Sequence, residues 1–123
     1  MQIKIIIALL FILSSSYSCN DNRHPGTNNG EQKFDKTKWK IKEDKNYPYR
    51  NLMLKDLLIN TKLHGLKKVE VLNLLGQPNR VDSNYLFYIV DQTHFVNIMP
   101  LHTKTLVIKF SNDGTVEWRK IHE

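Results

Sequence analysis

Cysteine is almost absent from this chain of 123 residues, in which Cys19 is the only one. No disulfide can form within the chain, so the folded part must depend on a modest apolar core. Long apolar runs are absent as well. The longest, residues 5–13, has nine residues, whereas a helix that crosses the bilayer needs roughly 20. A permanent transmembrane helix is therefore not expected.

Motifs of several common enzyme classes are also missing. Beyond residue 18 the chain has no Gly-x-Ser-x-Gly elbow and no glycine-rich phosphate loop. Asp82 and Asp91 flank a predicted strand, but they lack the paired geometry of general acid–base catalysis, and turn chemistry accounts better for Asp82. We predict no catalytic residue and no enzymatic activity.

The histidines do not form a metal-binding pattern. None of the five lies at a ligand spacing such as His-x3-His: His24, His64, His94, His102 and His122. Scattered surface positions explain them better than a shared metal ion. The sequence therefore predicts no metal site and no cofactor.

The N-terminus has the three-part layout of a secretory signal. Lys4 supplies the positive start, residues 5–13 the apolar run and residues 14–18 a stretch of small residues. Cys19 follows directly, which is typical of a bacterial lipoprotein that is cleaved before the cysteine and carries lipid on its thiol. We predict that residues 1–18 are a lipoprotein signal peptide and that Cys19 is the lipidation site.

Cleavage by the general signal peptidase is the alternative for this segment. Ser16 and Ser18 satisfy the small-x-small rule, and the usual lipoprotein pattern has leucine at the position of Ser16. That cleavage would leave Cys19 as an unpaired, reactive thiol in an oxidising compartment. Lipidation is therefore the favoured prediction.

The charge of the chain is moderately basic. It carries 18 Lys and Arg against 12 Asp and Glu, and removal of residues 1–18 takes away only Lys4, which lowers the net charge from +6 to +5. Lysines and acids alternate in the densest stretch, residues 33–45, as is typical of a solvated face. Export would remove nucleic acid as a partner and leave anionic lipid, polysaccharide or acidic protein.

The composition divides the remainder into a tether and a domain. Residues 20–32 contain Asn, Asp, Gly, Pro and Thr but no aliphatic side chain, so they cannot bury enough apolar area to offset the entropy of ordering. We predict a flexible tether over residues 19–33. Residues 34–123 then form a single small domain.

Two helices are expected in the first half of the domain. Leucines at helical spacing predict an amphipathic helix from Asn51 to about Lys62. A second helix of about nine residues ends at Leu75, because Gly76 can cap it and Pro78 prevents its continuation. Residues 34–42 are compatible with a further short helix that begins at Asp35.

Strands are expected in the second half. Aromatic, β-branched and alternating apolar residues predict strands over residues 85–90, 106–110 and 116–120, and Asn112-Asp113-Gly114 is a hairpin turn signal. Residues 93–105 are expected to be a long connection, with a short extra strand as the alternative. The order of elements predicts an α+β fold in which two helices precede an antiparallel meander.

The domain resembles the SmpA/OmlA (BamE-like) family of small outer-membrane lipoproteins over residues 63–118. The family motif stands here as Gly65-Leu66-Lys67, Val71 and Leu75-Gly76-Gln77-Pro78, followed by an aromatic strand similar to residues 85–88. The resemblance implies two helices packed on a three-stranded antiparallel sheet, a fold shared with β-lactamase-inhibitor-like (BLIP-like) domains. It also implies a lipid anchor at the periplasmic face of the outer membrane.

The sequence departs from the family in two places. Lys67 stands where the family has a Ser or Thr that caps the helix, a loss of roughly 1 kcal/mol if nothing replaces it. The segment 34–50 has no counterpart in the family. Its aromatic and arginine residues are typical of binding hot spots if they face solvent: Trp39, Tyr47, Tyr49 and Arg50. Packing over the helices as an N-terminal lid is the alternative.

Two functions are compatible with these observations. The first is a lipid-anchored cell-envelope protein, non-enzymatic, that serves as an accessory module and binds an envelope protein through its helix face or the aromatic segment. The second is a tethered periplasmic inhibitor or ligand-binding module of BLIP-like fold. Both hold the protein at the membrane by its N-terminal lipid, and neither involves nucleic acid.

Overall fold

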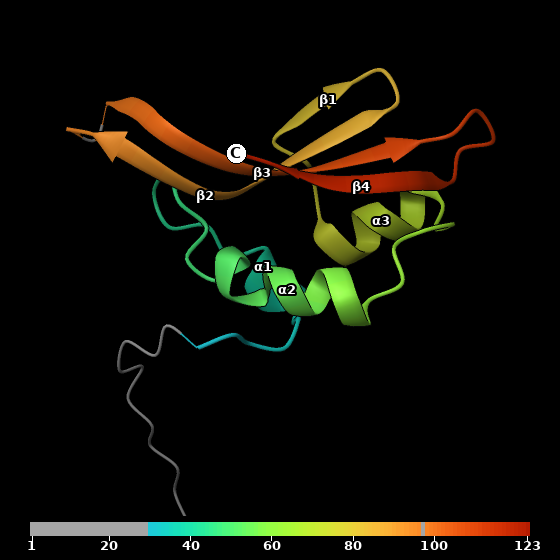
Figure 1. The fold of residues 1–123 in the computed structure, drawn as a ribbon, viewed down its shortest axis with the longest axis horizontal. Helices are drawn as coiled ribbons and strands as arrows, with labels where there is room; N and C mark the ends of the chain where they lie inside the picture. Colours follow the sequence, from blue (N-terminus) through green and yellow to red (C-terminus); the bar gives the residue numbers. More distant parts are fainter. Residues whose placement is uncertain (1–29, 97) are drawn as a thin grey trace, which may run out of the picture.

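Three helices lie on one face of a four-stranded antiparallel sheet in the computed structural model, which describes residues 30–96 and 98–123 (Figure 1). The helices are α1 (Lys36–Trp39), α2 (Arg50–Asn60) and α3 (Lys68–Leu75). The strands are β1 (Arg80–Asp82), β2 (Tyr85–Phe95), β3 (Met99–Phe110) and β4 (Val116–His122). The predicted α+β class, with helices before an antiparallel meander, is confirmed.

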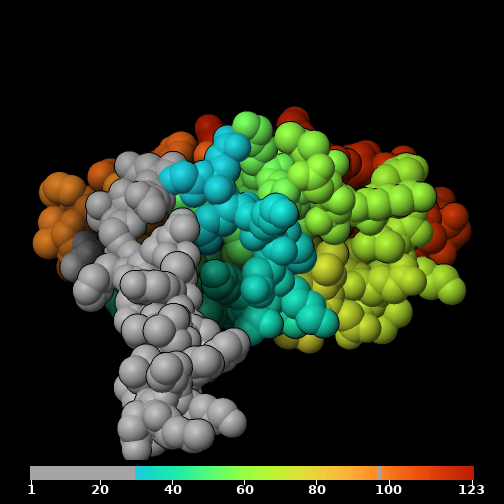
Figure 2. All heavy atoms as spheres, turned by 90° about the horizontal axis from the view of Figure 1, so that it is seen from below, coloured from blue at the N-terminus to red at the C-terminus, as the bar shows by residue number. Residues whose placement is uncertain are grey.

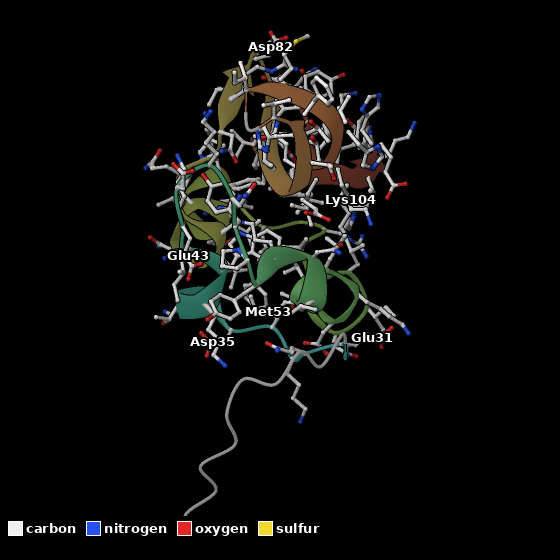
Figure 3. The ribbon with its side chains drawn as sticks, turned by 90° about the vertical axis from the view of Figure 1, so that its left-hand side faces the viewer. Glu31, Asp35, Glu43, Met53, Asp82 and Lys104 are labelled. Carbon is white, nitrogen blue, oxygen red and sulfur yellow. The ribbon has the colours of Figure 1, made fainter. Side chains whose placement is uncertain are left out.

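The sheet is a meander in which each strand pairs with its neighbours in sequence, in the order β1-β2-β3-β4. Side chains alternate between the two faces of a strand, and burial follows that alternation: Leu86, Tyr88 and Val90 of β2 are buried, as are Leu106 and Ile108 of β3. These residues point toward the helices, so the core lies between the two layers. Figure 3 shows the layers from the side, with Asp82 on the sheet and Asp35 and Met53 in the helical layer.

The helices contribute the other half of the core. One apolar stripe of α2 is fully covered, with Met53 and Leu57 inaccessible to solvent, and α3 buries Val71 and Leu75 in the same way. Fourteen apolar residues form one continuous cluster: Trp39, Met53, Leu54, Leu57, Leu63, Val71, Leu75, Leu86, Tyr88, Val90, Leu106, Ile108, Phe110 and Val116. Burial of such side chains contributes about 1.5 to 3 kcal/mol each, which a fold without disulfides depends on.

The ends of α3 show how its sequence fixes its length. The backbone N–H of Lys67 donates to a carboxylate oxygen of Glu70 at 2.7 Å, which is the acidic half of a capping box. The N–H of Glu70, which a Ser or Thr side chain would accept, donates to the carbonyl of Lys67 at 3.0 Å. At the other end Gly76 has φ +77°, a conformation that suits glycine. The predicted end of this helix is confirmed.

The first described residues pack against α2. The side chain of Asp35 accepts from the backbone N–H groups of Thr37 and Lys38 at 2.8 and 3.0 Å and thereby starts α1. Before it, the backbone N–H of Gln32 donates to the carbonyl of Leu52 at 2.8 Å, and Glu31 forms an ion pair with Lys55 of α2 at 2.7 Å. Residues of the predicted tether therefore already contact the domain.

The prediction of two helices on three strands is wrong in number. The additional helix is α1, in agreement with the short helix that the sequence allowed from Asp35. The additional strand is β1, whose three residues are all exposed and show no apolar alternation. A strand that buries no side chain in the core leaves no periodic apolar signal in the sequence. β1 is held by backbone pairing with β2, in register Arg80 with Phe87 and Asp82 with Tyr85.

Residues 93–105 are not a long connection. They form the far half of a β2–β3 hairpin, in which Gln92 pairs with Thr103 and Phe95 with Met99. The register shifts at two places along this hairpin, one of them between Ile89 and Asp91. Polar side chains and irregular register hide the period of two that marks a strand, which explains the wrong prediction.

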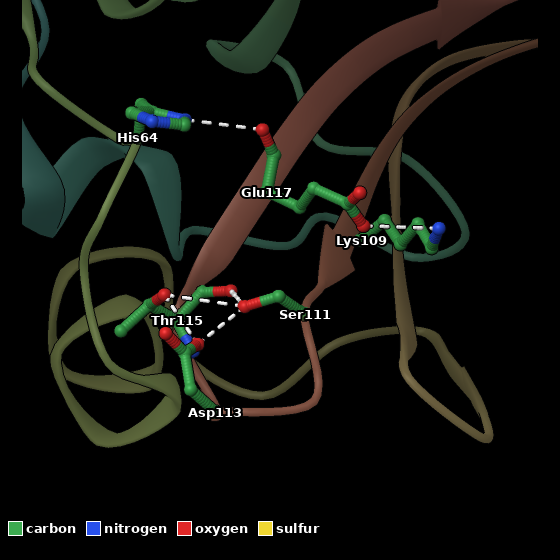
Figure 4. Close-up of polar contacts among 6 residues, drawn as sticks. All are labelled: His64, Lys109, Ser111, Asp113, Thr115 and Glu117. Carbon is green, nitrogen blue, oxygen red and sulfur yellow. Dashed lines mark hydrogen bonds and ion pairs between the residues drawn. The ribbon is translucent and has the colours of Figure 1, made fainter.

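The turn between β3 and β4 is closed by one carboxylate (Figure 4). Asp113 accepts from the hydroxyl of Ser111 and, at 2.7 and 3.0 Å, from the hydroxyl and backbone N–H of Thr115. These hydrogen bonds, led by that of Ser111, lower the pKa of Asp113 from 3.8 to about 2. Gly114 follows with φ +83°, so the predicted turn is confirmed.

We expect this turn to give the protein an acid-sensitive component of stability. Because folding lowers the pKa of Asp113, its stabilisation is fully present above pH 3.8 and is lost as the pH falls through about 2. The urea midpoint should fall more over this interval in the wild type than in Asp113→Asn. Parallel curves for the two proteins would contradict the assignment.

Candidate functional site

The face of the sheet that points away from the helices is the candidate site. Along β2 the residues between the buried ones are Tyr85, Phe87 and Ile89, and all three are half-buried. Val107 of β3 pairs with Phe87 and with Lys120 of β4. Among the described residues no helix covers this face, as Figure 1 shows. We call it the open sheet face.

Three aromatic rings form a cluster on the open sheet face. The rings of Tyr85 and Trp118 meet edge to face with centroids 5.9 Å apart, and those of Tyr85 and Phe87 lie 6.3 Å apart. The guanidinium of Arg80 lies 3.9 Å from the centre of the Phe87 ring. Such ring pairs are favourable contacts, and Trp, Tyr and Arg are common at binding hot spots.

A hollow of about 450 Å³ lies beside this cluster. Its lining combines apolar and polar side chains from all four strands and from the residue before β1: Asn79, Arg80, Phe87, Ile89, Thr103, Thr105, Val107 and His122. The volume falls within the range of small-ligand sites, about 300 to 1,000 Å³. An apolar floor with a few polar groups at its edge can hold an apolar side chain or a small amphipathic ligand.

The charges around the open sheet face are of both signs, because Asp82 pairs with Tyr85 and Arg80 with Phe87 on this side of the sheet. Lys109 is neutralised by Glu117 at 2.9 Å, and this hydrogen-bonded partner raises the pKa of Lys109. Arg80 and Lys120 form no ion pair with a carboxylate among the described residues. Their side chains can therefore face an acidic partner.

The aromatic segment predicted from the sequence lies elsewhere and is largely buried. Trp39 is inaccessible to solvent and Arg50 is only 2 % exposed, whereas Tyr47 and Tyr49 are half-buried. The exposure on which their role as a binding surface depended is therefore absent for Trp39 and Arg50. The alternative interpretation, a lid packed over the helices, agrees with this placement.

Arg50 holds this lid to the sheet. Its Nε donates to the carbonyl of Trp39 at 2.9 Å, and its Nη1 donates to the carbonyl of Ile89 at 2.7 Å and to Asn79 Oδ1 at 3.2 Å. The guanidinium also stacks on the ring of Tyr47, 3.5 Å from its centre. One side chain thus connects α1, α2, the start of β1 and β2.

This cation is buried without a carboxylate. Burial lowers the pKa of Arg50 to about 10, against the opposing influence of Tyr47 and Tyr88, so the side chain still carries its charge at neutral pH. Peptide carbonyls and ring faces stabilise it in place of an anion. The Nε and Nη1 donors and the guanidinium face of Arg50 are thus occupied by other parts of the fold, and we assign Arg50 a structural role.

Other candidates from the sequence find no shared site. No group of three or more His, Cys, Asp or Glu able to hold a metal occurs within residues 30–96 and 98–123. His64 Nδ1 lies 3.0 Å from the carbonyl of Glu117. None of the described helices is long and apolar enough to cross a membrane. Cys19 and His24 lie outside the described residues.

Comparisons with protein-family models, with curated proteins and with solved structures find no match for this chain. The SmpA/OmlA resemblance therefore remains a prediction that rests on residues 63–118. The candidate site rests on the geometry of the open sheet face alone.

Sequence reasoning missed the open sheet face, although a signal for it exists. Residues 85–90 are an unbroken run of aromatic and aliphatic side chains. A strand that faces water on one side alternates apolar and polar residues, whereas a continuous apolar run is typical of a strand covered on both sides. The run thus indicates that the second side of β2 is covered as well, which a binding partner would do.

Replacement of Arg50 should destabilise the fold strongly. Arg50→Met leaves the carbonyls of Trp39 and Ile89 buried without their donor, so we expect the free energy of unfolding to fall by about 2 to 4 kcal/mol. Urea denaturation measures this loss. Arg80→Met is the matched control on an exposed arginine and should cost less than about 1 kcal/mol. Equal losses in the two variants would show that the buried contacts contribute little.

Proposed function

We propose that this protein is a lipid-anchored, non-enzymatic module of the cell envelope that binds a protein partner through its open sheet face. The observation that carries the binding part of the proposal is an aromatic, apolar sheet face that no described helix covers. Contiguous apolar surface of this kind marks interaction sites in soluble domains. The anchor part is supported by the signal layout that ends at Cys19.

The chemistry of this face suggests the kind of partner. The Tyr85, Phe87 and Trp118 rings offer a platform for apolar side chains, and the neighbouring hollow of about 450 Å³ accepts one of them. Arg80 and Lys120 favour a partner segment with acidic residues beside its apolar anchor. The resemblance to SmpA/OmlA proteins supports an outer-membrane assembly protein as the partner.

A tethered inhibitor or ligand-binding module of BLIP-like fold is the second candidate. It is favoured by the same hollow, whose volume suits a small molecule as well as a side chain. The two candidates differ in the ligand that the open sheet face binds, which is a small molecule for the second candidate and a protein for the first. Native mass spectrometry of the purified protein would detect a retained small molecule, and cross-linking would detect a protein.

The anchor is tested by replacement of its only possible attachment point. In a bacterial host, the wild type should incorporate a clickable fatty-acid analogue and remain in the membrane fraction, whereas Cys19→Ala should do neither, because the thiol that receives the lipid is gone. The native signal is kept in both proteins. Equal fractionation and no label in the wild type would support the free-thiol alternative.

The binding face is tested by in-cell cross-linking followed by mass spectrometry of the captured proteins. Phe87→Ser and Trp118→Ser remove apolar contacts from the open sheet face, and we expect each to reduce capture of the partner at least about tenfold, as for a hot-spot residue. Ile59→Ser is the matched control, since Ile59 is an exposed apolar residue on α2.

Thermal unfolding of all three variants excludes misfolding as the cause of lost capture. If Ile59→Ser loses the partner and the two sheet variants retain it, the helix face is the binding surface instead. Captured outer-membrane assembly subunits that disappear in Cys19→Ala would support the family resemblance as a functional one.

A further inference from the structure

The far end of the β2–β3 hairpin is unusually apolar. Half of the exposed large apolar residues of the described chain lie within seven positions there, at 60 to 75 % exposure: Phe95, Val96, Ile98, Met99 and Leu101. The others are scattered over α2, α3, β1, β4 and the segment after α1. We call these five residues the hairpin tip. Such clustering is uncommon on a soluble surface.

The hairpin tip projects beyond the helical layer. Figure 1 shows the β2–β3 hairpin extending past α1 and α2 at one end of the molecule, and in Figure 2 the same end protrudes from the side. No described helix lies against it. The tip therefore adds little to the core, and its apolar side chains need another explanation.

The arrangement of the tip suits a fluid medium better than a protein groove. Phe95 and Met99 pair across the two strands and share one face, whereas Val96 and Ile98 lie in the turn and Leu101 at a register shift. Apolar side chains thus surround the end of the hairpin and do not form one flat patch. In a bilayer interface, lipid can contact apolar side chains on all sides of the hairpin end. A rigid protein surface would contact only one of these sides.

The turn itself carries a bulky residue where folding alone favours glycine or asparagine. Val96 has φ +50°, a conformation that is rare and strained for a β-branched side chain. The choice of valine at this position is consistent with a requirement for an apolar side chain at the end of the hairpin.

The charges near the tip do not oppose contact with an anionic lipid surface. No Asp or Glu occurs between Asp91 and Asp113, and the tip is flanked by His94 and His102. Lys104 lies further along β3, paired with Glu123 at 3.0 Å. An apolar end with no acid beside it avoids repulsion from anionic headgroups.

The distance to the proposed anchor permits the contact, a step that rests on the proposed function. Ten residues lie between Cys19 and Gly30, the first described residue, and the eleven Cα-to-Cα steps of that segment span at most about 40 Å. The first described segment, drawn in blue, starts on the side of the helical layer that faces away from the sheet, toward the end where the β2–β3 hairpin projects (Figure 1). A lipid at Cys19 would keep the tip within reach of the bilayer, where a weak contact suffices.

We propose that the hairpin tip inserts into the interfacial region of an anionic phospholipid bilayer as a second, reversible membrane contact. With two contacts the domain would also hold a fixed orientation, so that the open sheet face is presented at a set angle to the membrane.

The test places a fluorescent probe in the tip of the full chain. Ile98→Trp is compared with Asn112→Trp, a matched position in the exposed β3–β4 turn, and with the wild type, whose Trp39 and Trp118 give the baseline. The proteins are reconstituted in vesicles of equal parts zwitterionic and anionic phospholipid, with bromine on the upper acyl chains of one set. We expect blue-shifted, bromine-quenched emission from Ile98→Trp only.

Several outcomes would overturn the insertion. Emission from Ile98→Trp that matches Asn112→Trp in both vesicle sets would leave the tip in water. A blue shift that appears without lipid and grows with protein concentration would identify a second copy of the chain as the occupant. A shift that requires an added envelope protein would identify a protein groove.

A second measurement separates the tip from the anchor. In the Cys19→Ala background, Ile98→Asp should reduce co-flotation with the same vesicles at least about tenfold, because an aspartate replaces an aliphatic side chain at the bilayer interface. Ile59→Asp is the control on α2. Quenching at position 98 depends on insertion of the tip and not on lipidation of Cys19. The two proposals can therefore fail independently, and the experiment distinguishes the two failures.

Discussion

The guanidinium of Arg50 is the interaction on which the arrangement of the domain depends. Its donors reach the carbonyls of Trp39 and Ile89 and the amide of Asn79, and Asn79 in turn accepts from the backbone N–H of Ile89 at 2.8 Å. Loss of any of these partners would leave a buried charge without one of its hydrogen bonds, which strongly destabilises the folded state. The N-terminal segment, α2 and the edge of the sheet are therefore fixed relative to one another at one point.

Local patterns predicted much of this fold. The helical spacing of leucines, the Gly76 cap and the turn at Asp113 each act over a few residues, so their elements could be found from the sequence. β1 could not, because its three exposed residues carry no periodicity. Nor could the role of Arg50, because its partners lie 11 to 39 residues away in the chain.

The candidate site was missed for a related reason. A binding role was assigned to the segment 34–50 on the condition that its aromatic and arginine residues face solvent, but Trp39 and Arg50 are buried. The surface that remains uncovered belongs to β2, β3 and β4. A strand such as β2, apolar on both sides, gives no indication of which side meets the core. Only the position of the helices, all on one face, decides it.

The meander topology has a consequence for how the chain reaches this structure. Every strand pairs with its neighbour in sequence, so the sheet can grow one hairpin at a time with small loss of loop entropy. Low contact order of this kind goes with rapid folding. The contacts between the helical layer and the sheet are the distant ones, among them those of Arg50 with Ile89 and of Arg119 with Leu58. We expect them to form after the strands they join, so that the helical layer closes onto a sheet already in register.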